Sequence, residues 1–162
     1  MLNNILGIPA HPLIIHVAVV FIPLLCLGAV VYVVVPRFRG KIGWAVTALA
    51  VISPIAAWFA MESGENLRDR LVAAGFSQEV LDKVNQHQSY GDRTWWFTLA
   101  LGVVTLGLLF ITSGSRRAPQ HLPLGVNLAV SVVVIALAVA TAIYVFLTGD
   151  SGAHAVWEGA VP

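Results

Sequence analysis

The stretch PLIIHVAVVFIPLLCLGAVVYVVV, residues 12–35, decides the fold class of this chain. It contains no Asp, Glu, Lys or Arg, and His16 is its only histidine. At about 1.5 Å per residue, a helix of this length crosses the roughly 30 Å of bilayer hydrocarbon. Backbone groups find no water there, so a helix is the expected conformation. We expect this span to be retained, because no positively charged leader of a signal peptide precedes it.

Three further apolar runs follow, over residues 42–61, 95–112 and 124–147. The chain of 162 residues is 58% hydrophobic and only 10% charged, with a mean hydropathy of +0.85. Soluble domains carry about 25% charged residues, so much of the surface of this short chain must face lipid. The expected fold is a single domain over residues 1–162, an all-α integral membrane four-helix bundle.

The charged residues between the runs predict how the helices cross the membrane. The first connection, residues 36–41, has three basic residues and no acid. The third connection, residues 113–122, has Arg116 and Arg117 and no acid. Loops rich in Lys and Arg stay in the cytoplasm. We therefore expect a multi-pass protein of the bacterial inner membrane with both termini on the outer side.

Residues 62–94 connect the second and third runs, and we expect a short amphipathic helical segment there rather than a plain loop. The pattern up to Ala73 continues the second helix outward, and Gly75 is a suitable residue to end it. Ser77 can cap the next helical stretch. That stretch can run on into the third span, with a candidate break at Gly91.

Most ionisable groups suited to chemistry fall at the outer end of the predicted bundle. Such groups near a membrane are candidates for function, because burying them there is costly. Among these groups, three histidines are candidate cofactor ligands, since imidazole binds metals and haem iron: His16, His87 and His11. The Gly-rich tail from 148 to 154 is expected to form a turn. The full set of candidate metal ligands contains four histidines and three carboxylates: His11, His16, His87, His154, Glu62, Glu65 and Asp150.

The first two histidines differ by five positions, which is about 140° around a helix. This spacing is poor for two ligands on one ion, so if both His11 and His16 act, they face different partners. Pro12 suits a first helical turn, and we expect His11 to sit before it on the entry loop. His121 is expected to be an interfacial loop residue at the inner end.

A loose internal repeat suggests that histidines from the two halves share a site. His16 precedes a span, a basic loop, a span and Glu62-Ser63-Gly64, and His87 precedes the same order ending in Asp150-Ser151-Gly152. Duplicated helical hairpins related by an axis along the membrane normal would place His16 and His87 face to face. Facing histidines on two helices can hold a b-type haem in a bundle core.

The motif His11-Pro12-Leu13-Ile14-Ile15-His16 resembles the opening His-Pro-x-x-x-His of a family of small four-span bacterial membrane proteins of unknown function. The resemblance extends to His87, to Glu62-Ser63-Gly64-Glu65 and to the Gly-rich residues 149–153. It implies fold and topology more than activity. The family's repeated histidines have prompted haem or metal proposals without an assigned reaction. Related tails often carry a histidine near Asp150, whereas this chain has His154.

Three functions stay open. The first is a membrane redox protein that binds haem b near the outer face and exchanges electrons with quinone or a periplasmic redox protein. The second is a zinc or copper site built from the same histidines and carboxylates, and this ligand mixture favours zinc over copper(I). The third is a non-catalytic accessory subunit of a larger respiratory membrane complex, or a homo-oligomer, in which the histidines only form hydrogen bonds.

Other classes of protein find little support. No nucleophile, base and electrophile occur together at a telling spacing, so an enzyme is not expected. Cys26 stands alone, which excludes an internal disulfide, a CxxC redox pair and a covalently attached c-type haem. Nucleic-acid binding is not expected, because the sequence has no dense cluster of basic residues. The lipid bilayer is the partner that the composition itself predicts.

Overall fold

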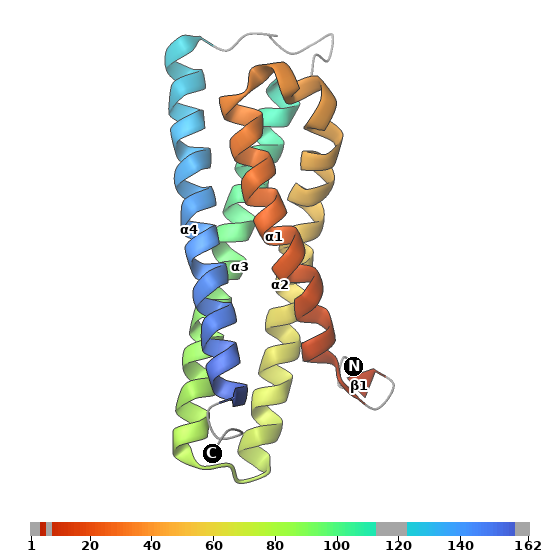
Figure 1. The fold of residues 1–162 in the computed structure, drawn as a ribbon, viewed down its shortest axis with the longest axis vertical. Coiled ribbons are helices and arrows are strands. Elements are labelled where there is room, and N and C mark those ends of the chain that lie inside the picture. Colours follow the sequence, from red (N-terminus) through yellow and green to blue (C-terminus); the bar gives the residue numbers. More distant parts are fainter. Residues whose placement is uncertain (1–3, 6–7, 113–122, 158–162) are drawn as a thin grey trace.

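Four long helices run along one axis and confirm the expected all-α bundle (Figure 1). The computed structural model describes residues 4–5, 8–112 and 123–157. Each helix is long and apolar enough to cross a membrane, so the chain is a multi-pass membrane protein. The four helices are α1 (Ala10–Val34), α2 (Arg39–Ala73), α3 (Gln78–Thr112) and α4 (Leu124–Trp157).

Three short elements accompany the bundle. Strands β1 (Asn4–Ile5) and β2 (Ile8–Pro9) pair antiparallel before α1, with Ile5 opposite Ile8. The 3-10 helix η1 (Pro36–Phe38) joins α1 to α2. Elements of two or three residues are too short to leave a periodic pattern, so they were not predicted.

The helices form two hairpins, α1–α2 and α3–α4. α1 packs against α2 and α4, and α3 packs against the same two helices. α1 and α3 make few contacts and therefore lie diagonally opposite one another. A side chain of α1 that points to the bundle axis therefore points toward α3.

The hairpin turn between α2 and α3 follows the predicted chemistry. α2 ends at Ala73, and Gly75 adopts a φ of 74°, the left-handed conformation that favours glycine after a helix. α3 then begins at Gln78. At about 1.5 Å per residue these 35-residue helices are roughly 50 Å long, well beyond the 30 Å of hydrocarbon. They extend past the start of α1 at the lower end of Figure 1.

Two expectations about glycines were wrong. α3 continues through Gly91 without a break. α4 continues through Gly149 and Gly152 to Trp157, so the expected turn in the tail is helical. A helical glycine costs only about 1 kcal/mol, which packing against a neighbouring helix readily offsets.

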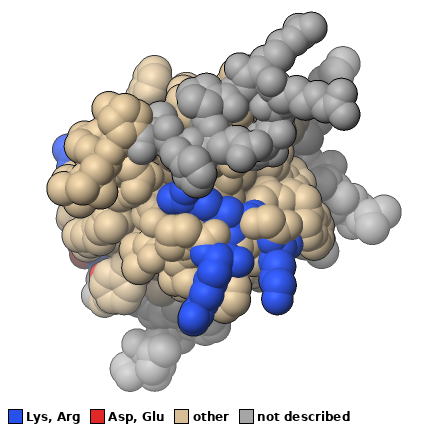
Figure 2. All heavy atoms as spheres, turned by 90° about the horizontal axis from the view of Figure 1, so that it is seen from above, with Lys and Arg blue, Asp and Glu red and all other residues tan. Residues whose placement is uncertain are grey.

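The two ends of the bundle differ in chemistry. We call the end with η1 the basic end, and Figure 2 shows that Lys and Arg side chains gather on it. Arg39 is anchored there: its Nε–H donates to the Tyr32 carbonyl at 3.0 Å, and its guanidinium lies 5.4 Å from the Tyr32 ring centre. The predicted loop 113–122, with Arg116, Arg117 and His121, lies outside the described residues. We call the opposite end, where α1 begins and α4 ends, the histidine end.

Candidate functional site: a histidine pair

His11 lies in the first turn of α1 and reaches across to α2. Its Nδ1 is 3.0 Å from the Ala60 carbonyl oxygen and 3.0 Å from Ser63 Oγ. The Ser63 hydroxyl donates to the same Ala60 carbonyl at 2.9 Å, and Ser63 is only 2% exposed. α1 includes Ala10, so the expected position of His11 on an entry loop was wrong.

These contacts decide which ring nitrogen of His11 carries hydrogen in the neutral form. A carbonyl oxygen only accepts hydrogen bonds, so Nδ1 must be the donor to Ala60. The Nε2 of neutral His11 then has a free lone pair. A histidine whose Nδ1–H is held by a backbone carbonyl is oriented for ligation through Nε2.

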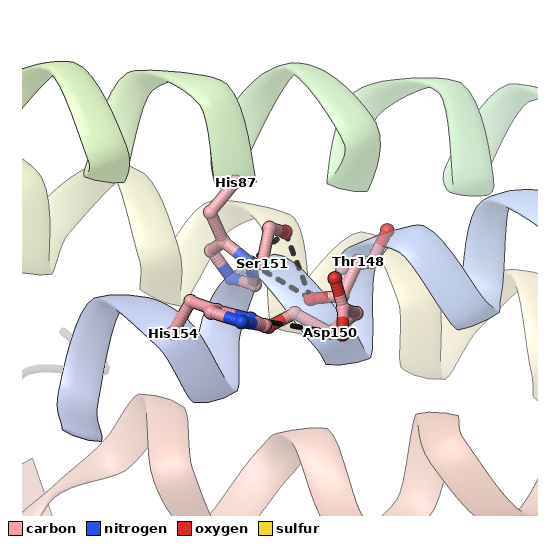
Figure 3. A network of polar contacts seen from close by, with 5 residues as sticks. All are labelled: His87, Thr148, Asp150, Ser151 and His154. Carbon is pink, nitrogen blue, oxygen red and sulfur yellow. Dashed lines mark hydrogen bonds and ion pairs between the residues drawn. The ribbon is translucent and has the colours of Figure 1, made fainter. Parts of the chain in front are cut away.

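His87 repeats this arrangement on α3. Its Nδ1 donates to the Thr148 carbonyl at 3.0 Å and lies 3.2 Å from Ser151 Oγ, which in turn donates to the Thr148 carbonyl. Figure 3 shows the His87 ring reaching from α3 to these two residues of α4. Each histidine therefore ties the first helix of its hairpin to the second and keeps Nε2 available.

A glycine beside each ring makes room for it. A Cβ added to Gly64 would lie 3.2 Å from Cε1 of His11. A Cβ added to Gly152 would lie 2.9 Å from Cε1 and 3.1 Å from Nδ1 of His87. Ala at position 152 would thus force the His87 ring to move, since carbon atoms do not approach so closely.

The two histidine rings face each other across the bundle, and we call His11 and His87 the histidine pair. Their ring centres are 6.1 Å apart and their planes stand at 81°. Both rings are half-buried. They belong to the diagonal helices α1 and α3, so each hairpin supplies one ring. The expected pair was His16 and His87, but the structure places His11 rather than His16 next to His87.

A family model described as "Predicted membrane protein (DUF2231)" matches residues 7–162, a segment that contains both histidines of the pair. The chain belongs to the DUF2231 family. The expected membership of a membrane protein family of unknown function is confirmed, whereas the match by itself says nothing about the histidine motif. Comparison with curated proteins and with solved structures gave no match.

The buried positions of this DUF2231 chain show that its two hairpins are built alike. Counted from His11 in α1 and from His87 in α3, every buried residue of one helix has a buried counterpart at the same distance in the other. A conserved spacing of buried positions places equivalent faces toward the bundle axis. The counterparts are Ala18 and Thr94, Ile22 and Thr98, Leu25 and Leu101, Cys26 and Gly102, Ala29 and Thr105, Tyr32 and Leu108, and Val33 and Leu109.

The second helices of the hairpins correspond in part, at a spacing of their own. Val46, Ala50 and Ser53 of α2 match Val134, Ala138 and Thr141 of α4, and all six are buried. The contacts of the histidine pair match as well: Ala60, Ser63 and Gly64 correspond to Thr148, Ser151 and Gly152. The loose repeat expected from the sequence thus has a register, and this register aligns His87 with His11.

Two of the other candidate histidines form hydrogen bonds within their own helices. His16 is exposed, and its Nδ1 contacts the Pro12 carbonyl of its own helix at 2.6 Å. His154 is held by its own helix too, with Nδ1 2.9 Å from the Asp150 carbonyl and 3.6 Å from the Asp150 carboxylate. Glu65 is exposed.

The described part of the chain does not assemble the expected cluster of histidines and carboxylates. Within residues 4–5, 8–112 and 123–157, no group of three or more His, Cys, Asp or Glu side chains could hold a metal ion together. Glu62 accepts a hydrogen bond from Asn66, but only through its backbone carbonyl. The candidate site is therefore a two-ligand site. The repeated Ser-Gly dipeptide could have pointed to the supporting residues Ser63 and Ser151. Nothing in the sequence could have pointed to the backbone carbonyls of Ala60 and Thr148.

Proposed function

We propose that the histidine pair binds one haem b through the two Nε2 atoms and that the protein transfers electrons at the histidine end. The observation that supports this best is the pair itself. Two half-buried rings face each other at 6.1 Å between centres, and each has Nδ1 committed to a carbonyl. Each half of the bundle thus supplies one imidazole whose Nδ1–H is held by a backbone carbonyl, so Nε2 is the nitrogen that would bind a cofactor.

The distance between the rings fits ligands on opposite sides of one metal. An imidazole nitrogen binds a first-row metal at about 2 Å and its ring centre lies about 1 Å further, so opposed ligands have centres roughly 6 Å apart. Two ligands at a tetrahedral angle would bring the centres to about 5 Å. A separation of 6.1 Å would allow His11 and His87 to hold the same haem iron. The donor set of the histidine pair therefore fits haem.

When bound, haem supplies a one-electron redox centre. The protein's own residues hold and orient the ligands. The Ala60 and Thr148 carbonyls fix the Nδ1–H groups of His11 and His87, and such outer contacts raise the basicity of the ligating nitrogen. Quinone in the bilayer or a periplasmic redox protein is the proposed partner for electron exchange.

The first prediction concerns the absorption spectrum. Protein purified from haem-replete cells is expected to show a Soret band, and His11→Ala and His87→Ala are each expected to abolish it because two ligands are required. His16→Ala is the matched control, since His16 is exposed and its Nδ1 forms a hydrogen bond within its own helix. The control should keep the band at full height.

Two other outcomes would replace the proposal. A colourless wild-type protein with stoichiometric zinc or copper in elemental analysis would assign the histidine pair to a bare metal ion. A protein with neither haem nor metal would leave the pair as a clamp, since its Nδ1 hydrogen bonds already join α1 to α2 and α3 to α4. That result would favour the accessory-subunit hypothesis.

The second prediction concerns orientation. We propose that the histidine end faces outward from a bacterial inner membrane, because the basic end carries Arg37, Arg39 and Lys41. In a Cys26→Ala background, Ala74→Cys at the α2–α3 turn should react with a membrane-impermeant maleimide on intact cells. Gly40→Cys at the basic end should react only after the membrane is opened. The reverse labelling pattern would invert the topology.

A further inference from the structure

A pocket of about 290 Å³ lies beside the histidine pair at the histidine end. One wall is a face of α3 with Lys83, Gln86 and Tyr90, and the other is a face of α4. Ser151 belongs to this second wall and also contacts His87 Nδ1 at 3.2 Å. The pocket is therefore one side chain away from the proposed haem ligand. The lining residues on α4 are Leu147, Asp150, Ser151, His154 and Ala155.

Both the cationic Lys83 and the carboxylate of Asp150 in the pocket lie near a side chain of their own helix that can pair with them. Lys83 Nζ lies 3.8 Å from a carboxylate oxygen of Glu79 on the preceding turn. His154 Nδ1 lies 3.6 Å from Asp150 Oδ1, and Figure 3 shows these two side chains on successive turns of α4. A phosphate or carboxylate ligand would meet the Asp150 carboxylate, and like charges close together repel. The pocket thus suits a neutral ligand.

The hydrogen-bonding groups call for a ligand with both acceptors and donors. Lys83 offers only donors, the Gln86 amide and the Tyr90 hydroxyl offer both functions, and the Asp150 carboxylate offers only acceptors. Leu147 supplies an apolar patch on the side toward the membrane. The volume lies at the lower end of the range for small-molecule sites, so it accommodates a single ring rather than a whole lipid.

We propose that this pocket binds the headgroup of a quinone or quinol from the bilayer. A quinone carbonyl accepts hydrogen bonds and a quinol hydroxyl donates them, the ring is neutral, and the apolar tail can pass Leu147 into the lipid. The choice of a redox-active ring rests on the proposed function of the histidine pair. The preference of the pocket for a neutral ring with donors and acceptors is independent of that proposed function.

The third prediction tests the pocket by filling it. A short-tail benzoquinone should bind protein in phosphatidylcholine nanodiscs above the level retained by empty nanodiscs. Ala155→Phe should weaken this binding at least 10-fold, because the added ring occupies the pocket. Tyr90→Phe should weaken it by about 2- to 10-fold through loss of one hydrogen bond. Leu67→Phe is the matched control, since Leu67 holds the position of Ala155 in the other hairpin, outside this pocket.

The same measurement separates this inference from the proposed function. His11→Ala removes a proposed haem ligand on α1 but touches no residue of the pocket, so quinone binding should persist in that variant. Wild-type protein that shows a Soret band but retains no quinone above empty nanodiscs would overturn the pocket and leave the haem proposal standing. Binding that Ala155→Phe does not weaken would also overturn it, as would Ala155-dependent binding of phosphatidylglycerol in place of quinone.

Discussion

Gly102→Val is expected to cause a large loss of stability in the bundle. A Cβ at position 102 of α3 would lie 2.7 Å from the Ala50 carbonyl oxygen of α2 and 3.1 Å from Pro54 Cγ. The nearest atom is backbone, so α2 and α3 must move apart to relieve the overlap. Overpacking of this kind costs about 3 kcal/mol, which corresponds to a fall of roughly 6–12 °C in Tm for a protein of this size.

Thermal unfolding in mild detergent, followed by circular dichroism, measures this change. Gly107→Val is the matched control on the same helix, because Gly107 is exposed and a Cβ there meets nothing within 4 Å. The control should change Tm by no more than about 2 °C, in line with surface substitutions. Equal melting temperatures for both variants would show that α2 and α3 do not approach closely at Gly102.

Gly152→Ala is expected to displace the His87 ring. The new methyl group would lie 2.9 Å from Cε1, so the ring must leave its place and give up the hydrogen bond to Thr148. A hydrogen bond of this kind contributes about 1 kcal/mol, and 1.4 kcal/mol corresponds to a factor of ten in population. The reaction of His87 with diethyl pyrocarbonate should therefore become roughly 5-fold faster. In the haem-bound protein, a disturbed contact behind a ligand weakens binding by about 10- to 100-fold.

Gly149→Ala is the control for this substitution. Gly149 lies one turn earlier on α4, and an added Cβ there meets nothing within 4 Å. In this control, His87 should react with diethyl pyrocarbonate at the wild-type rate, with the modification assigned to His87 by mass spectrometry. A Gly152→Ala protein with an unchanged rate would mean that the ring does not rest against residue 152. Gly64→Ala should act similarly but more weakly on His11, since its Cβ would lie 3.2 Å from the ring.

The helices could be predicted because length and hydropathy are local properties. The apolar runs, the basic connection and the Gly75 turn are each visible within a short window, and the structure places them as expected. The helix ends outside the membrane were harder to predict. Gly91 and Gly149 look like breaks in sequence, but α3 and α4 continue through them, and a hydrogen bond between Thr94 and Thr148 joins the two helices close by.

The histidine pair could be predicted only in outline. The 140° between His11 and His16 correctly implied that the two face different partners, and it is His16 that is exposed. Which of them meets His87 depends on where α1 starts. Because the helix begins before Pro12, His11 is already on its first turn and can reach Ser63. The motif alone does not contain this information.

The backbone carbonyls that accept hydrogen bonds from the histidine pair could not be predicted, for a different reason. Any residue has a carbonyl, so nothing marks Ala60 or Thr148 as the one that receives a histidine Nδ1–H. The buried positions shared by α1 and α3 would have supplied the correct register, because they repeat at the same distances from His11 and His87. That correspondence becomes visible only once burial is known.

The likeness of the two hairpins has one more consequence, for how the molecule can change. In a symmetric dimer of identical hairpins, any substitution near one histidine would appear beside the other as well. Here both hairpins belong to one polypeptide, so each can acquire its own neighbours while the shared ring-to-ring contact is kept. Tyr90 and His154 beside His87 stand where Ile14 and Asn66 stand beside His11. Fusion of the halves thus permits a nearly symmetric pair of histidines beside a pocket whose lining residues all come from the α3–α4 hairpin.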